Sequence, residues 1–346
     1  MAQPPAATPI KTEQLVTDVL ATIERERERE IVARRFGLFD RKETLEQIGE
    51  MLGITRERVR QLEKAVVTRL RGTAEQGALP HVAGFQAKLL ELLHASGELA
   101  RVSELTAKLS DKPSREEQAR VAFLSQLSPE LAVILEDDNF YYSVGVKAVR
   151  DEKAVKAAVS QLIDTIKQIG EPQTIEQIAK AAAIGTAPET AALASTSKHL
   201  ATLNGRWGLI KWPMVNPKNI RDKIYVILKE RGKHMHFNEI AAAIKDSDFK
   251  RKDVTTQAIH NELIKDKRFV LIGRGIYALK EWGYEKGTVA DIISEVLKKA
   301  NEPLHRDEIV KQVLKSRFVK ETTILLNLQG KPQFKRVAKA TYALAE

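Results

Sequence analysis

Residues 44–71 read TLEQIGEMLGITRERVRQLEKAVVTRLR, and this stretch predicts two helices joined by a tight turn. Thr44 and Gln47 form a capping box ahead of apolar residues spaced three and four apart, which is the pattern of a short amphipathic helix. Gly53 breaks that helix, and Thr55 is a good N-cap for a second, longer one. The buried face of the second helix is marked by Val59, Leu62, Val66 and Leu70. We therefore expect a helix-turn-helix.

The second helix presents a polar face near its N-terminus, because its apolar residues turn inward. The candidates for DNA base contacts on this face are Arg56, Glu57, Arg60 and Gln61. Arginine can bind guanine, glutamate can accept from cytosine and glutamine can pair with adenine. The candidates for DNA backbone contacts are Thr55, Arg58 and Lys64. The residues alone also allow a solvated helix face held by salt bridges to Glu57 and Glu63.

The stretch from Arg25 to Arg71 resembles region 4 of primary sigma factors. The resemblance rests on RFGL at 35–38, TLEQIG at 44–49 and ITRERVRQLE at 54–63. In that family this helix reads the promoter −35 element. The resemblance therefore implies base contacts by Arg56, Glu57 and Gln61, and an approach to backbone or bases by Arg58 and Arg60. Nothing in the chain resembles the segment with which sigma factors melt and hold the −10 element, so we do not expect a complete sigma factor.

The residues before this motif predict a leader and one more helix. We expect residues 1–12, rich in proline and alanine, to be disordered, and place the first domain at residues 13–78. Apolar residues from Leu15 to Ile23 recur at helical spacing. The run from Glu24 to Glu30 alternates glutamate with arginine, and we expect a solvated helix face with no chemistry of its own.

The C-terminal part of the chain repeats itself. HFNEI at 236–240 is echoed by HRDEI at 305–309, and YAL follows Phe269 as it follows Phe334, at the same spacing. Each copy reads as three helices followed by a pair of apolar strands, which is the pattern of a winged helix. We expect winged helices at residues 219–282 and 286–346, and two weaker copies at residues 85–146 and 150–215.

Residues 219–282 also resemble the HARE-type helix-turn-helix. The resemblance is carried by DKIY at 222–225, HNELI at 260–264 and GRGIYAL at 273–279. That family includes bacterial proteins fused to sigma region 4 and the winged domain of the RNA polymerase delta subunit. The resemblance implies a role at nucleic acid or at the polymerase.

The positive charge of the chain lies at its C-terminal end. The formal net charge is +10, and residues 216–346 hold 27 basic and 17 acidic side chains. This surplus favours a polyanionic partner, although a lysine-rich solubilising surface would give the same count. Further candidates for DNA backbone contacts are Lys267, Arg268 and Arg274. Arg274 lies between two glycines, so it can equally belong to an ordinary exposed turn.

Several kinds of site are excluded or unsupported. The chain has no cysteine, which excludes thiolate nucleophiles and cysteine-bound metals. His234 and His236 lack a third ligand, and no phosphate-binding glycine loop or nucleophile motif occurs. We therefore expect no enzyme activity, no cofactor, no metal and no small-molecule substrate. With no apolar run of membrane-spanning length, we expect no membrane contact and a cytoplasmic, nucleoid-associated protein.

The expected fold is mainly α: a sigma region 4 type helix-turn-helix followed by a tandem array of small winged helices, each with three helices and a β-hairpin. The expected function is that of a sigma-factor-like transcription protein, with promoter-like double-stranded DNA and core RNA polymerase as partners. Two alternatives remain open. One is a polymerase-associated accessory or scaffold protein similar to the delta subunit, and the other is a reader of modified DNA.

Overall fold

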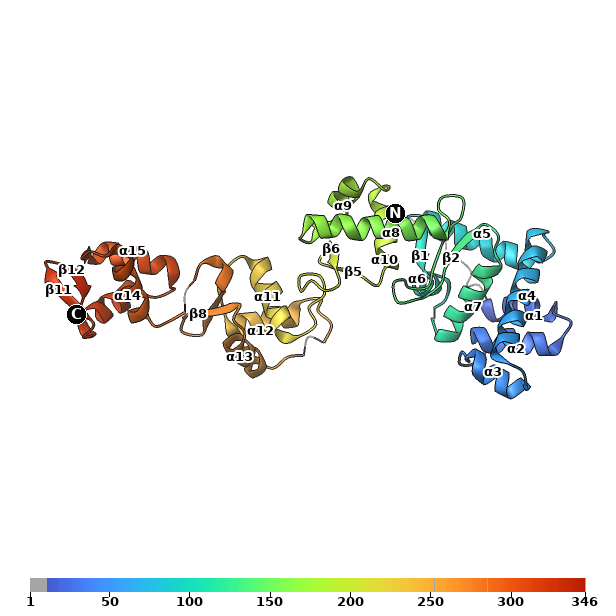
Figure 1. Cartoon of the computed structure of the whole chain (residues 1–346), viewed down its shortest axis with the longest axis horizontal. Helices are drawn as coiled ribbons and strands as arrows, with labels where there is room; N and C mark the ends of the chain where they lie inside the picture. Colours follow the sequence, from blue (N-terminus) through green and yellow to red (C-terminus); the bar gives the residue numbers. More distant parts are fainter. Residues whose placement is uncertain (1–10, 112, 252, 285, 346) are drawn as a thin grey trace. The chain divides into compact units, whose positions relative to one another are not determined.

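The computed structural model describes residues 11–111, 113–251, 253–284 and 286–345. It divides into two compact units, Met1–Ile210 and Lys211–Glu346. Each unit is mainly helical (Figure 1), as the sequence predicts. Its small sheets have three strands where the sequence predicts a two-stranded hairpin. Among the described helices, none has both the length and the apolar character needed to cross a bilayer. Most of the expected leader lies outside the described residues, but Thr12 already begins the first helix and is buried, so it is not part of a disordered leader.

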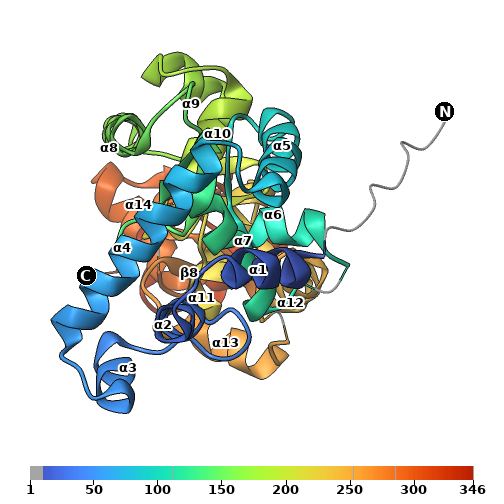
Figure 2. The same ribbon diagram turned by 90° about the vertical axis from the view of Figure 1, so that its right-hand side faces the viewer.

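Four helices open the first unit: α1 (Thr12–Ala21), α2 (Glu26–Phe36), α3 (Leu45–Leu52) and α4 (Arg56–Glu75). The capping box predicted at Thr44 is confirmed, since its hydroxyl accepts from the Gln47 N–H at 3.2 Å and Gln47 Oε1 accepts from the Thr44 N–H at 2.9 Å. Gly53 ends α3 with φ 64°, and the Thr55 side chain caps α4. The predicted helix-turn-helix is thus formed by α3 and α4 (Figure 2).

After α4, the described residues contain four segments with one common order of elements: helix, short strand, two helices and two strands. In each segment the last strand lies between the other two and is antiparallel to both. We call these segments repeats 1 to 4.

Repeat 1 comprises α5 (Pro80–His94), β1 (Leu99–Arg101), α6 (Val102–Leu109), α7 (Arg115–Leu127), β2 (Leu131–Ile134) and β3 (Ser143–Val146). Repeat 2 comprises α8 (Glu152–Ile169), β4 (Gln173–Thr174), α9 (Ile175–Ala182), α10 (Ala187–Thr196), β5 (Leu200–Leu203) and β6 (Arg206–Leu209). Repeat 3 comprises α11 (Ile220–Arg231), β7 (Met235–His236), α12 (Phe237–Asp246), α13 (Thr256–Lys265), β8 (Phe269–Gly273) and β9 (Ile276–Leu279), followed by a short 3₁₀ helix, Lys280–Trp282. Repeat 4 comprises α14 (Val289–Ala300), β10 (Leu304–His305), α15 (Arg306–Ser316), α16 (Glu321–Gly330), β11 (Phe334–Ala338) and β12 (Thr341–Leu344).

One hydrophobic core joins three of the first four helices to repeat 1. Its buried residues come from α1, α2 and α4 and from every helix of repeat 1, and include Val16, Val32, Leu70, Phe85, Leu105 and Phe123. The rings of Phe36 and Phe123 meet edge to face with centroids 5.0 Å apart. The buried guanidinium of Arg120 donates to the Leu38 carbonyl at 2.8 Å. Although the sequence separates residues 13–78 from residues 85–146, the two segments pack as one body.

Repeats 1 and 2 also dock closely. Gly97 has φ +80°, and a Cβ at this position would lie 2.5 Å from the Pro188 carbonyl oxygen at the start of α10. The Tyr141 N–H donates to the Thr196 carbonyl at 2.8 Å at the other end of that helix. The third helix of repeat 2 is therefore held against repeat 1.

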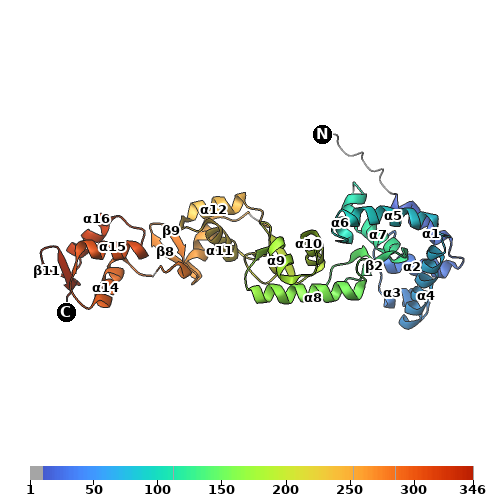
Figure 3. The same ribbon diagram turned by 90° about the horizontal axis from the view of Figure 1, so that it is seen from above.

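Repeats 3 and 4 meet through the loop between α15 and α16 (Figure 3). The Phe318 N–H donates to the Ile272 carbonyl at 3.1 Å on the edge of β8, and its ring lies 4.5 Å from that of His234. A Cβ on Gly273 would lie 2.8 Å from the Phe318 carbonyl oxygen, so this contact requires glycine. The hairpin of repeat 3 is covered along this edge by repeat 4.

Candidate nucleic-acid interface

A small core holds α3 at its angle to α4. Ile31, Ile48 and Val59 are fully buried there, one from each of α2, α3 and α4. Gly49 lies in the middle of α3, and a Cβ there would be 2.7 Å from the Ile54 carbonyl oxygen in the turn. Sequence reasoning gave Gly49 no role, although a glycine inside an amphipathic helix is itself a signal of close backbone approach.

Ion pairs fix α2 against α4. Glu28 contacts Arg69 at 2.8 Å and Arg25 at 3.3 Å, and only 8% of its side chain is exposed. The hydrogen bond from Arg69 is the main cause that holds the pKa of the Glu28 carboxyl below its ordinary value. The expectation that the run from Glu24 to Glu30 is a solvated face was therefore wrong at Glu28. It failed because alternation of charge shows nothing about long-range partners such as Arg69.

The start of α4 carries the candidate base contacts on an exposed face. Arg60 makes two hydrogen bonds to the Glu57 carboxylate, at 2.6 and 2.8 Å, and Gln61 donates to it at 3.3 Å. Arg58 Nη1 donates to Gln61 Oε1 at 3.4 Å. Arg56 instead contacts Glu46 on α3 at 2.9 Å, with 70% of its side chain exposed. The salt-bridged face that the residues also allowed is thus present in the structure.

These ion pairs act on the one carboxylate of the face. The hydrogen bonds from Arg60 lower the pKa of Glu57 from 4.5 to about 2. A glutamate is ionised at neutral pH with or without this shift, so Glu57 acts only as an acceptor. Lys64 lies further along the same helix, in a shallow depression that it lines with Arg60, Gln61 and Arg69. The face therefore offers several cations, one amide and one carboxylate within a few turns of helix.

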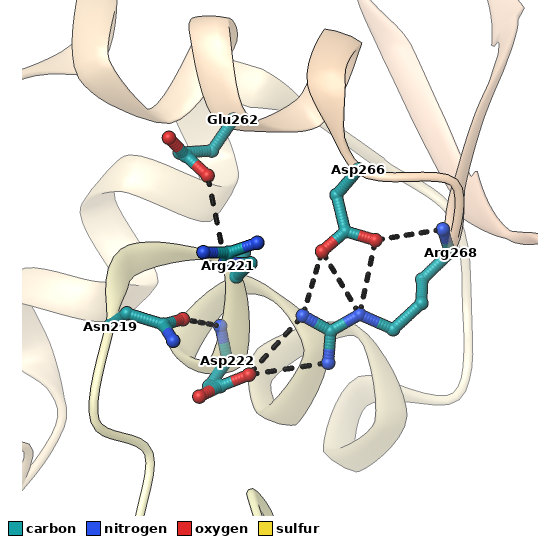
Figure 4. Close-up of polar contacts among 6 residues, drawn as sticks. All are labelled: Asn219, Arg221, Asp222, Glu262, Asp266 and Arg268. Atoms are coloured by element: carbon teal, nitrogen blue, oxygen red, sulfur yellow. Dashed lines mark hydrogen bonds and ion pairs between the residues drawn. The ribbon is translucent and has the colours of Figure 1, made fainter.

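The candidate backbone contacts of repeat 3 differ from one another. Arg268 bridges Asp266 at 2.8 Å and Asp222 at 3.2 Å (Figure 4). Its guanidinium lies 5.3 Å from the centre of the Tyr225 ring. Two carboxylates thus already neutralise Arg268 and tie the start of β8 to α11. Lys267 and Arg274 are exposed, and Arg274 lies at the tip of the hairpin beside Gly275, which has φ +70°.

The two histidines weighed as metal ligands have other contacts. His236 caps α12, because its Nδ1 accepts from the Asn238 N–H at 3.3 Å. The His234 ring packs at a tilt against the ring of Phe318 in repeat 4. Each ring is therefore engaged in local packing or capping.

The comparisons with known proteins concern the helix-turn-helix formed by α3 and α4. Residues 25–72 match the family model described as "Sigma-70, region 4". A curated protein named "RNA polymerase sigma factor SigA", from Bacillus sp, is 48% identical over 67 residues, which cover 19% of this chain. The chain spans only 17% of the length of that relative. The resemblance of this segment to sigma region 4 is confirmed, while the resemblance of residues 219–282 to the HARE type stays a prediction.

Proposed function

We propose that this protein is a non-enzymatic DNA-binding transcription protein that recognises −35-type promoter DNA with the first turns of α4. The observation that carries the proposal is the exposed polar face of α4 on a helix-turn-helix similar to sigma region 4. A helix of this kind enters the major groove with its N-terminal residues.

Each side chain on this face has a base partner suited to its chemistry. Arg56 and Arg60 would bind guanine, Gln61 would bind adenine and the ionised Glu57 would accept from cytosine N4. In reaching a base, Arg60 exchanges part of its contact with Glu57 for the base edge. The backbone contacts would come from Thr55, Arg58 and Lys64.

A second surface would supply affinity that depends little on sequence. We infer that repeats 1 to 4 are winged helices, which is supported by their common order of three helices and three short strands. We also infer that repeat 3 is of the HARE type, which is supported by the residues at 222–225, 260–264 and 273–279. The basic surplus of residues 216–346 suits contact with DNA phosphates. Lys267 and Arg274 are the proposed phosphate contacts of repeat 3, and Arg268 remains a weaker candidate because of its ion pairs. The proposed role places the protein in the cytoplasm with core RNA polymerase.

The test is equilibrium binding of the full chain to a −35-containing duplex and to a scrambled duplex over a salt series. The variant Arg56→Ala with Gln61→Ala should lose roughly 1–3 kcal/mol of discrimination per residue. The matched control is Arg71→Ala with Gln76→Ala, which removes the same side-chain types from the last turns of α4 and from its C-cap and should keep the preference.

The result that overturns the proposal is equal binding of both duplexes at every salt concentration. In that case the helix-turn-helix would serve contact with RNA polymerase, as in an accessory or scaffold protein. A preference confined to duplexes with modified bases would instead favour a reader of modified DNA.

A further inference from the structure

The third helices of the four repeats differ in what they leave exposed. In a winged helix, the third helix is the element placed to enter a DNA groove. In repeat 1, α7 is covered by α1, α2 and α4, and only Arg115 along its length is exposed. In repeat 2, α10 is packed against β1 and leaves only Pro188 exposed. These two helices cannot reach DNA without dismantling the first unit.

The third helices of repeats 3 and 4 are accessible but chemically different. The exposed residues of α16 are Glu321, Thr322, Leu326, Gln329 and Gly330, which include one acid and no cation. The exposed residues of α13 are Thr256, Gln257, Asn261, Ile264 and Lys265. Of the two, only α13 combines amides with a positive charge.

The side chains of α13 form one stripe. Gln257, Asn261 and Ile264 follow one another at helical spacing, and Gln257 Nε2 donates to Asn261 Oδ1 at 3.1 Å. Lys265 extends the stripe, and 61% of Ile264 is exposed. Glutamine and asparagine are the side chains that bind adenine in pairs of hydrogen bonds, and an apolar side chain can contact the thymine methyl group.

Cationic side chains lie in the segments before and after α13. Before α13, the exposed Lys250 and Arg251 are held in place because the buried Lys223 donates to their carbonyl oxygens, at 2.8 and 2.6 Å. After α13, the exposed Lys267 and Arg274 lie on the strand entry and on the hairpin tip. Their charge complements DNA phosphates, in the part of the chain that holds the whole basic surplus.

We propose that α13 is a second DNA-reading helix and that it selects A·T-rich duplex through Gln257, Asn261 and Ile264. This inference rests on the proposed function, because it takes DNA as the partner. It concerns α13 in the second unit, whereas the proposed function concerns α4 in the first. Of the four repeats, repeat 3 would thus add selectivity through α13 to the sequence-independent phosphate contacts of Lys267 and Arg274. Repeats 1 and 2 would hold the helix-turn-helix in place, and repeat 4 would support the hairpin of repeat 3.

The experiment uses the full chain and duplexes that carry one −35-type element next to either an A·T-rich or a G·C-rich flank. The wild-type protein should prefer the A·T-rich flank, by roughly fivefold or more for each side chain that pairs with adenine. The variant Gln257→Ala with Asn261→Ala should lose this flank preference and keep the preference for the −35 element. The matched control, Thr322→Ala with Gln329→Ala, changes the exposed polar residues of α16 and should keep both preferences.

Two results would overturn the inference: no flank preference in the wild-type protein, or a preference that survives Gln257→Ala with Asn261→Ala. Failure of the proposed function gives a different pattern, in which the −35 preference is missing whatever the flank. All substituted residues are exposed, and thermal melting of each variant checks that it is folded like the wild type.

Discussion

Substitution Phe123→Ala in repeat 1 should loosen the helix-turn-helix, although Phe123 lies outside that motif. Phe123 is fully buried and packs on Phe36 of α2, in the core that also holds Val66 and Leu70 of α4. Replacing a buried phenylalanine with alanine costs about 3–5 kcal/mol. If α4 opens together with repeat 1, its amide protection should fall by at least about 150-fold.

Hydrogen exchange followed by mass spectrometry measures this directly, on peptides that cover the C-terminal half of α4. The control is Leu263→Ala in α13, which empties a similarly buried position in the second unit and should leave the exchange of α4 unchanged. If α4 kept its full protection in Phe123→Ala while α7 lost it, the shared core would not be a cooperative unit and the reasoning would be refuted.

Three further predictions concern single contacts. Gly49→Ala should destabilise the first unit by about 1–3 kcal/mol in urea denaturation, because its Cβ would lie 2.7 Å from the Ile54 carbonyl; unchanged stability would contradict the close approach. The pKa of Glu28 is lowered in the folded state, so its contribution is present above its ordinary pKa of 4.5 and is lost as the pH falls through the lower folded value. Glu28→Gln should therefore destabilise the protein at pH 7, by about 1–3 kcal/mol, and by less at pH 3, and an equal loss at both would count against the ion pair with Arg69. Arg268→Ala should lower the melting temperature and leave the salt dependence of DNA binding unchanged, whereas a shallower salt slope with unchanged stability would show a phosphate contact instead.

Local signals in the sequence were sufficient to predict the local structure. The capping box at Thr44, the break at Gly53 and the N-cap at Thr55 each depend on residues a few positions apart, and all three are confirmed. The predicted buried face of α4 is confirmed at Val59, Val66 and Leu70, while Leu62 is only half-buried. Periodicity identifies an inward face but not how completely another element covers it.

Contacts between distant segments were not predictable in this way. Three of these contacts join residues far apart in the chain. They are the core shared between α4 and α7, the close approach of Gly97 to Pro188 and the hydrogen bond of Phe318 to β8. The pairing of Arg268 with Asp222 belongs to the same class. Residue type and spacing indicated which side chains could bind DNA, but only the structure showed which of them already had carboxylate partners.

The ion pairs on α4 have a consequence for selectivity in different ionic conditions. Arg56 and Arg60 each pair with a glutamate and are the proposed contacts to base edges rather than to phosphates. Because a base contact neutralises no phosphate, this face of the helix releases few of the cations condensed on DNA. The contribution of this face to DNA affinity should therefore decrease slowly with added salt. The contribution of the lysine-rich C-terminal surface should decrease quickly. Moderate ionic strength would then increase the preference for a matched element over random DNA, because it shortens the residence time on random DNA more.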